Sequence, residues 1–211
     1  MHDLTAGPAD HANAAIGGAG IDGSAYLDVV HTAQHAPVWL DRLISGYSAY
    51  GLALSAGLML LGWWHARNHS QERAVQALAV PLITVGAFAV SSVLKLVVRE
   101  DRPCQSLRVV TLEACPAPGD WSFPSNHATL AAAAAVALWF VSRRLGLAAT
   151  AVALTMATSR VWVGAHYPHD IAAGLADGVV VAAPLSVLIR TYAPALSGPL
   201  GRGPLRRLVA S

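Results

Sequence analysis

Charged residues are scarce in this sequence. Only 12% of the 211 residues are Asp, Glu, Lys or Arg, about half the share in soluble globular domains, whereas 55% are hydrophobic. This deficit argues against a soluble domain and favours a membrane protein. The formal net charge of +2 at pH 7 is too small to indicate nucleic-acid binding. The length suits one compact helical unit without a second large soluble domain.

The N-terminal segment 1–24 lacks both a basic start and a continuous apolar core. Asp3 stands where a secretory signal peptide would carry basic residues, and Gly and Ala dominate the rest of the segment. We therefore expect no cleavable signal peptide and interpret 1–24 as a flexible tail. The sequence also lacks internal repeats.

Long apolar runs are abundant in the remainder of the chain. Five stretches are long and apolar enough to cross a bilayer as helices of about 20 residues: 43–64, 74–98, 126–142, 145–165 and 170–189. The segment 25–42 is too polar to span and is expected to form an amphipathic interfacial helix, broken at Pro37. The predicted fold class is all-α, an integral membrane bundle of about five transmembrane helices.

Arginine is concentrated between and after these stretches. The residues concerned are Arg67, Arg73, Arg143, Arg144, Arg190, Arg202, Arg206 and Arg207. With five crossings these positions share one side, which the positive-inside rule identifies as cytoplasmic. We therefore expect one membrane domain over 25–190 and a cytoplasmic basic tail over 191–211. The protein would lie in the cell membrane, plasma or inner, with the loops 99–125 and 160–169 outside.

Only two cysteines are present, Cys104 and Cys115, and both lie in the loop 99–125. An outward-facing loop can keep a disulfide, whereas a cytosolic loop rarely does. We favour a bridge that stiffens the loop, with two unpaired thiols as the alternative.

The first of three polar clusters on the expected outer side holds Lys95 and Arg102. Lys95 is the only lysine of the chain, and Arg102 follows seven residues later. This separation is about two helical turns, so both cations can share one helix face. Taken alone, Lys95 equally suits a residue that anchors a helix end at the membrane surface.

The second cluster is "FPSNHATL", residues 123–130, where the third apolar stretch starts. Ser125 or Asn126 suits the N-cap of a helix after Pro124, and His127 falls in the first turn. The free backbone N–H groups of a helix start form an anion site. Taken alone, the cluster is better explained as an ordinary helix cap with an incidental histidine.

The third cluster is "SRVWVGAHYPHD", residues 159–170. Pro168 suits the first turn of the last stretch, which places His166 just before that turn and Asp170 within it. Asp170 can then bind one ring nitrogen of His166 and leave the other free. Arg160 offers planar donors suited to phosphate oxygens. The alternative is an interfacial histidine beside a capping aspartate.

Together, the clusters predict phosphoryl transfer that does not require a metal. Cations and backbone N–H groups would stabilise the phosphate oxygens while one histidine attacks phosphorus and the other protonates the departing oxygen. A metal site is the competing interpretation. One well-placed carboxylate among several cations does not suit zinc or magnesium, so we expect no metal and no cofactor.

At these residues the sequence resembles the type-2 phosphatidate phosphatase superfamily. The signature of that family is K-x6-R-P, then P-S-G-H, then S-R-x5-H-x3-D. The corresponding residues here are Lys95, Arg102-Pro103, Pro124-Ser125-Asn126-His127, Ser159-Arg160, His166 and Asp170. Order and spacing match, and the one departure is Asn126 in place of glycine.

The resemblance implies a role for each matched position. His166 would be the nucleophile that forms a phosphohistidine, Asp170 would orient it, and His127 would be the general acid. The implied phosphate-binding residues are Lys95, Arg102, Ser125, Asn126 and Arg160, with Asn126 acting through nearby backbone N–H groups.

Within the superfamily, the stretches around His127 and His166 look most like the bacitracin-resistance-type undecaprenyl-diphosphatases. This likeness implies removal of the terminal phosphate from a polyprenyl carrier of cell-wall synthesis. Phosphatidate and phosphatidylglycerol phosphate are alternative substrates. A vanadate-dependent haloperoxidase and a non-catalytic lipid-phosphate binder or transporter are more distant alternatives. The expected partners are the lipid phosphate and the bilayer, without nucleic acid; a homo-oligomer is left open.

Overall fold

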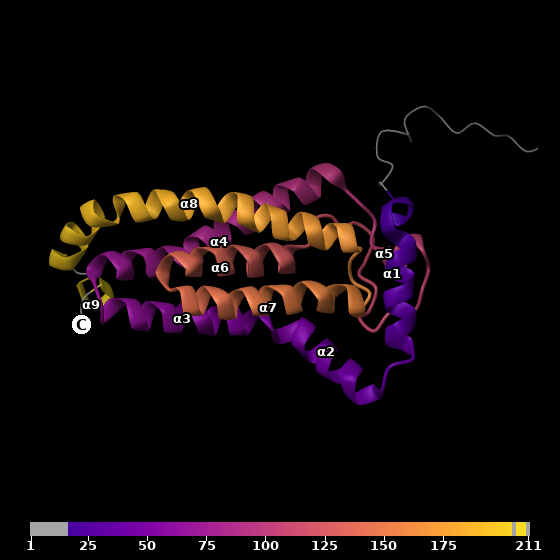
Figure 1. The fold of residues 1–211 in the computed structure, drawn as a ribbon. Coiled ribbons are helices and arrows are strands. Elements are labelled where there is room, and N and C mark those ends of the chain that lie inside the picture. The colour runs from indigo at the N-terminus through magenta and orange to yellow at the C-terminus, as the bar shows by residue number, and fades with distance from the viewer. Residues whose placement is uncertain (1–16, 204–205, 210–211) are drawn as a thin grey trace, which may run out of the picture.

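The computed structural model describes residues 17–203 and 206–209, and within these ranges the chain forms nine helices and no strand (Figure 1). The helices are α1 (Ala19–Gln34), α2 (Val38–Tyr50), α3 (Leu52–Arg67), α4 (Gln71–Val98), α5 (Pro103–Ser106), α6 (Asn126–Val141), α7 (Arg143–Trp162), α8 (Pro168–Arg202) and α9 (Arg206–Val209). The predicted all-α class is confirmed.

The apolar helices follow the predicted stretches in order. α4, α7 and α8 are each long and apolar enough to cross a membrane. α2 and α3 satisfy the same test as a pair bent by 53°, and α6 is a shorter apolar helix of 16 residues. The chain is therefore a multi-pass helical membrane protein, while the number of five crossings stays a prediction.

Two helix boundaries differ from the expected ones at the ends of the bundle. α1 begins at Ala19, inside the segment interpreted as a tail, because Asp22 accepts a hydrogen bond of 2.7 Å from the backbone N–H of His169 in α8. Residues 1–16 of that tail lie outside the described residues. The segment 25–42 is divided between α1 and α2, with the break at Pro37 as predicted.

The C-terminal boundary also moves. α8 continues to Arg202 and so includes most of the segment expected as a basic tail over 191–211. The reason is tertiary packing, because Ala193 and Leu200 join an apolar cluster with Ala74 and Val75 of α4. Favourable packing of this kind stabilises a helix beyond the point that its sequence alone predicts.

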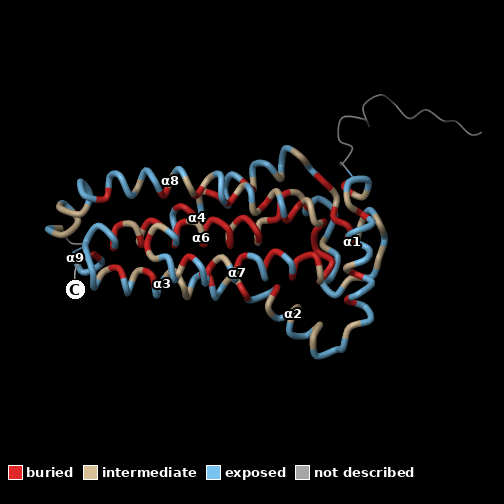
Figure 2. Tube along the Cα trace, in the orientation of Figure 1, coloured by how far each residue is buried: buried red, intermediate tan, exposed pale blue. Residues whose placement is uncertain are grey.

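α6 is the central helix of the bundle, and Figure 2 shows it buried along much of its length. Ala131–Ala135 are each at most 5% exposed, so small side chains let the neighbouring helices approach. A Cβ atom on Gly174 of α8 would lie 2.5 Å from the carbonyl oxygen of Ser125, and one on Gly178 would lie 2.6 Å from that of Thr129. α6 and α8 therefore pack closely along this G-x-x-x-G pair.

α1 lies across one end of the bundle, at the right of Figure 1. Its buried residues recur every three or four positions and so form one face: Gly23, Tyr26, Val30 and Ala33. The Tyr26 hydroxyl donates to the carbonyl oxygen of Gly164 at 3.0 Å, and its ring centroid is 5.4 Å from that of Tyr167. α1 therefore covers the connection between α7 and α8, where the third polar cluster lies.

Candidate active site

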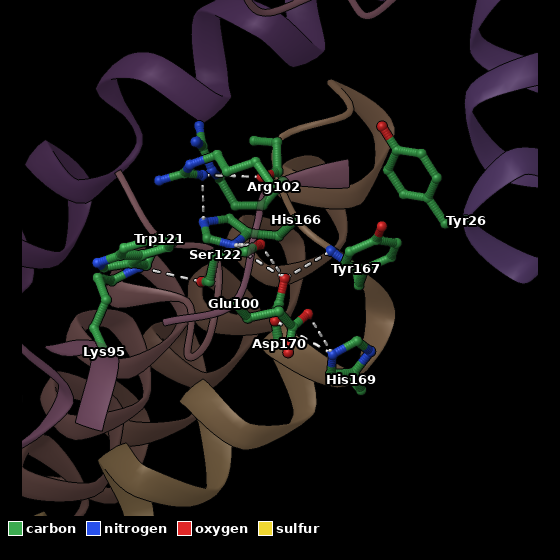
Figure 3. Close-up of polar contacts among 12 residues, drawn as sticks. Tyr26, Lys95, Glu100, Arg102, Trp121, Ser122, His166, Tyr167, His169 and Asp170 are labelled. Atoms are coloured by element: carbon green, nitrogen blue, oxygen red, sulfur yellow. Dashed lines mark hydrogen bonds and ion pairs between the residues drawn. The ribbon is translucent and has the colours of Figure 1, made fainter. Parts of the chain in front are cut away.

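The His166 side chain lies in the short connection between α7 and α8 and is held from three directions (Figure 3). Its Nδ1 is 3.4 Å from Asp170 Oδ2 and 3.3 Å from Ser122 Oγ, and its Nε2 is 3.3 Å from Nη1 of Arg102. A proton on Nδ1, facing the carboxylate, leaves the lone pair on Nε2 at the side of Arg102. The predicted pairing of His166 with Asp170 is present in the structure.

His166 is neutral at physiological pH. Burial is the main cause that lowers the pKa of its imidazole to about 3; the hydrogen bond to Asp170 raises that pKa and the Arg102 charge lowers it. The ring is only 2% exposed, which accounts for the size of the burial effect. A neutral imidazole with a free lone pair is the form that acts as a nucleophile.

Asp170 is fully buried and serves two purposes in the first turn of α8. Its Oδ2 accepts hydrogen bonds from the Tyr167 backbone N–H at 2.8 Å and from Ser122 Oγ at 2.5 Å. The same carboxylate therefore caps the helix and fixes the orientation of His166. Ser122 was not identified from the sequence, because an isolated serine outside a signature carries no distinctive pattern.

Lys95 and Arg102 both hold the chain segment that precedes α6. Lys95 Nζ donates to the carbonyl oxygens of residues 121–122 at 2.6 and 3.1 Å. Arg102 Nε donates to the carbonyl oxygen of Asp120 at 3.1 Å, its Nη2 pairs with Asp120 Oδ1 at 3.0 Å, and its Nη1 donates to Ala165 at 2.9 Å. Arg102 thus reaches His166 directly, whereas Lys95 joins the group through the backbone.

The start of α6 lies next to this group. Ser125 is the N-cap residue, its backbone N–H donates to the Asp170 carbonyl oxygen at 3.1 Å, and its side chain makes no capping hydrogen bond. Ser125 Oγ is buried without a partner among the described residues. The Asn126 side chain instead faces α4, where its Oδ1 accepts from Ser91 Oγ at 2.8 Å. A helix start without a side-chain cap is suited to an anion.

His127 and Arg160 line a cavity of about 340 Å³ beside this group. Arg160, in the last turn of α7, is 4% exposed; its Nη1 donates to Ser48 Oγ at 2.7 Å and pairs with Glu113 Oε2 at 2.7 Å. Its Nη2 pairs with Glu113 Oε1 at 3.1 Å. His127 therefore belongs with Arg160 rather than with the hydrogen bonds around His166.

Glu113 is a second residue that sequence reasoning missed. Cys104 and Cys115 form a disulfide, which confirms the predicted bridge, and Glu113 lies two residues before Cys115. Glu113 pairs with Arg160, and Asp120 of the same loop pairs with Arg102. Neither carboxylate belongs to a sequence motif. The predicted disulfide was the sequence feature that indicated an ordered loop near these arginines.

Sequence reasoning also missed a group of polar side chains around His169, next to Asp170 (Figure 3). His169 Nδ1 is 2.8 Å from Asp22 Oδ1, and its Nε2 is 2.9 Å from Glu100 Oε1 and 3.5 Å from Asp170 Oδ1. Burial, followed by the Asp170 charge, raises the pKa of Glu100 to about 7. This group connects α1, the loop 99–125 and α8 through one histidine.

The same group includes the atoms that suit a metal ion best within residues 17–203 and 206–209. Ligand atoms of Glu100, His169 and Asp170 lie within 4.8 Å of one another. Both ring nitrogens of His169 already bind carboxylates, so hydrogen bonding alone accounts for the arrangement.

Comparisons with known proteins identify the family of this chain. Residues 76–193, more than half of the chain, match the model of the PAP2 superfamily. The chain is 28% identical to undecaprenyl-diphosphatase BcrC of Bacillus subtilis over 152 residues, which cover 72% of this chain and 76% of that protein. It is 37% identical over 156 residues to lipid A 1-phosphatase of Rhizobium etli, with 66% of each chain covered.

A shorter match and a solved structure complete the comparison. The chain is 39% identical over 98 residues to decaprenylphosphoryl-5-phosphoribose phosphatase of Mycobacterium tuberculosis, covering 46% of this chain and 52% of that protein. The transmembrane PAP2-type phosphatidylglycerolphosphate phosphatase of Bacillus subtilis shares the fold, with a TM-score of 0.50 and 18% identity over 85% of this chain and 88% of that chain. The signature, the helical membrane fold and the family match therefore place this chain in the PAP2 superfamily, as a multi-pass membrane phosphatase.

Proposed function

We propose that this protein removes the terminal phosphate of a polyprenyl diphosphate, with undecaprenyl diphosphate as the leading substrate, at the outer face of the cell membrane. The observation that carries the proposal is the neutral, buried His166, oriented by Asp170 and facing Arg102 with its second nitrogen. The likeness to an undecaprenyl-diphosphatase over most of both chains supports the substrate class.

The reaction proceeds in two displacements at phosphorus. His166 Nε2 attacks the terminal phosphorus, a P–N bond forms, and the bond to the bridging oxygen breaks as His127 donates a proton to that oxygen. Polyprenyl phosphate then leaves. A water molecule, deprotonated by His127, attacks the phosphohistidine, the P–N bond breaks, and inorganic phosphate leaves with His166 restored.

The cations and the start of α6 stabilise the charge that develops on the transferred phosphate. Arg102 lies beside the nucleophile, while Arg160 and Ser125 retain donors without acceptors among the described residues. Lys95 adds positive charge on the same side. Such preorganised donors lower the barrier because they need not reorganise during the reaction. The mechanism uses no metal ion, so a chelator should leave turnover unchanged.

The arginine distribution supports this orientation in the membrane. The α3–α4 connection, the α6–α7 connection and the end of α8 lie at the end of the bundle opposite the α7–α8 connection, which contains His166 (Figure 1). Arg67, Arg143 and Arg202 belong to these segments, and the positive-inside rule assigns them to the cytoplasm. His166 would then face the outside or periplasm.

The proposal is tested by measuring phosphate release by the detergent-purified full-length protein. Undecaprenyl diphosphate, phosphatidate and phosphatidylglycerol phosphate are compared side by side, with and without a chelator. We expect the highest kcat/KM for undecaprenyl diphosphate. His166→Ala should abolish phosphate release. His65→Ala, which changes an exposed histidine in the last turn of α3, should leave it unchanged.

Three results would contradict the proposal. Preference for a glycerolipid would replace the substrate, and activity in His166→Ala would remove the proposed nucleophile. Binding of lipid phosphate without release of inorganic phosphate would instead favour a non-catalytic binder.

A further inference from the structure

We infer that Glu113 competes with the phosphate of the lipid headgroup by occupying both terminal nitrogens of Arg160 until the headgroup displaces it. In the structure the carboxylate holds both of these nitrogens. This inference rests on the proposed function for the phosphate-binding role of Arg160, and it adds a residue that sets how tightly the headgroup phosphate binds.

The contact has the geometry that a phosphate would adopt. Glu113 Oε2 is 2.7 Å from Arg160 Nη1 and Oε1 is 3.1 Å from Nη2, so the two groups form a bidentate pair. Carboxylates and phosphates bind a guanidinium through the same pair of parallel hydrogen bonds. The carboxylate therefore occupies the donors that a substrate phosphate needs.

The surroundings of Arg160 show a site built for a further acceptor. Its side chain is only 5% exposed, yet its Nε has no partner among the described residues. Buried donors normally find a hydrogen-bond partner, because an unsatisfied one is costly. An anion that enters the cavity lined by Arg160 and Glu113 would satisfy this nitrogen, which Glu113 does not reach.

The backbone of the loop holds Glu113 in place, while its side chain is partly exposed to solvent. The Glu113 backbone N–H donates to Val163 at 3.0 Å, its carbonyl oxygen accepts from Thr111 Oγ1 at 2.7 Å, and the disulfide closes the loop at Cys115. The carboxylate side chain is nevertheless 42% exposed. Rotation of that side chain toward solvent would release Arg160 without any movement of the loop.

Asp120 and Arg102 provide a comparison within the same loop. That pair has a single contact of 3.0 Å, and backbone carbonyl groups of Asp120 and Ala165 bind the other nitrogens of Arg102. Arg102 therefore keeps its position without the Asp120 carboxylate. Of these two pairs, the Glu113–Arg160 pair is the one in which a carboxylate occupies both terminal nitrogens of the arginine.

Displacement of Glu113 weakens the binding of every phosphate headgroup. A phosphate reaches both terminal nitrogens of Arg160 only in molecules whose Glu113 side chain has turned away, so the apparent affinity falls with the fraction of such molecules. A carboxylate that stays nearby also repels the phosphate, and the repulsion is strong in a partly buried cavity. Removal of the Glu113 charge should therefore tighten phosphate binding.

The test measures the binding of inorganic phosphate to the full-length protein by calorimetry. We expect Glu113→Gln to bind phosphate about tenfold more tightly than the wild type, because a repelling charge is removed. Glu113→Asp, which keeps the charge but shortens its reach, should bind about threefold more tightly. Glu72→Gln removes one charge from the exposed first turn of α4 and should bind like the wild type.

Unchanged or weaker phosphate binding in Glu113→Gln would overturn the inference, because that result is expected if Glu113 only orients Arg160. If Glu113→Gln does not fold, phosphate binding by Glu113→Asp is compared with the wild type instead, and unchanged or weaker binding again overturns the inference. A lack of phosphate binding in every variant would also overturn it. Tighter binding in a protein that hydrolyses no polyprenyl diphosphate would support the role of Glu113 and reject the proposed substrate, so the two failures are distinguishable.

Discussion

Asp170 Oδ2 is the atom on which the residue-scale geometry of the site depends. It accepts hydrogen bonds from the Tyr167 backbone and from Ser122, and it also faces His166 Nδ1. The imidazole is therefore oriented by a carboxylate that is itself fixed. Supporting contacts of this kind hold a reactive group in its productive geometry.

Replacement of Asp170 by Asn should lower kcat by about a thousandfold with little change in KM, because the orienting charge beside His166 is lost. Steady-state kinetics on undecaprenyl diphosphate, with circular dichroism as a folding control, measures this effect. A folded Asp170→Asn variant within a few-fold of wild-type kcat would contradict the assigned role.

Ser122→Ala should have a smaller effect of the same kind. We expect kcat to fall about tenfold, since one hydrogen bond to the Asp170 carboxylate is removed while the charge remains. Ser92→Ala is a matched control, because the exposed Ser92 hydroxyl binds only the carbonyl oxygen of Phe88. Equal kcat in the two variants would show that Ser122 does not position Asp170.

The lowered pKa of His166 also predicts a pH dependence of stability. The unfolded chain takes up this proton near the ordinary pKa of 6.5, whereas the folded protein takes it up only near 3. The stability contributed by the neutral ring is therefore fully present above pH 6.5 and is lost as the pH falls toward 3. Thermal unfolding should show a steeper loss of Tm between pH 6.5 and 4 for the wild type than for His166→Asn. Parallel curves would contradict the assignment.

At the residue scale, the sequence predicted the contacts that lie within one motif. The four-residue separation of His166 and Asp170 was sufficient to anticipate their pairing across the start of a helix. Ser122 and Glu113 could not be found in this way, because they reach His166 and Arg160 from 44 and 47 residues away through an irregular loop. Loop conformation depends on long-range contacts that local patterns do not encode.

At the scale of elements, the close contact between α6 and α8 fixes the site. Gly174 lies against the carbonyl oxygen of Ser125, and Gly178 lies against that of Thr129, one helical turn deeper. The two helix starts are also joined by the hydrogen bond from the Ser125 N–H to Asp170. Any separation of these helices would move the proposed anion site at Ser125 relative to the proposed nucleophile, His166.

Gly174→Ala and Gly178→Ala should each destabilise the protein by about 1–3 kcal/mol, because the added methyl group overlaps backbone atoms of α6. Gly174→Ala should in addition lower kcat/KM more strongly, since its contact is with Ser125. Thermal unfolding and kinetics of both variants measure the two effects. Equal losses of kcat/KM would show that the contact at Gly174 affects stability alone.

The elements themselves were largely predictable, apart from their ends. Apolar runs identified the bundle helices, and Pro37 identified the break before α2. The start of α1 and the extension of α8 were not predicted, because they depend on Asp22 binding His169 and on Ala193 packing against α4. Both are contacts between distant parts of the chain.

At the scale of the whole molecule, the bundle separates two chemically different ends. The site, the disulfide and α1 occupy one end, and the arginine-rich connections occupy the other (Figure 1).

A reporter protein fused after Ser211 should therefore lie in the cytoplasm. We expect a green fluorescent protein fused at this position to be fluorescent and an alkaline phosphatase fused at the same position to be inactive. The opposite pair of results would reverse the proposed orientation. The number of five crossings stays a prediction.

The most direct test of the central claim is to trap the phosphorylated protein. The wild-type protein is mixed with undecaprenyl diphosphate that carries a labelled terminal phosphate, quenched in alkali within milliseconds, and digested for peptide mapping. We predict an acid-labile label on His166. The absence of any protein-bound label during turnover, or a label on His127 instead, would contradict the account.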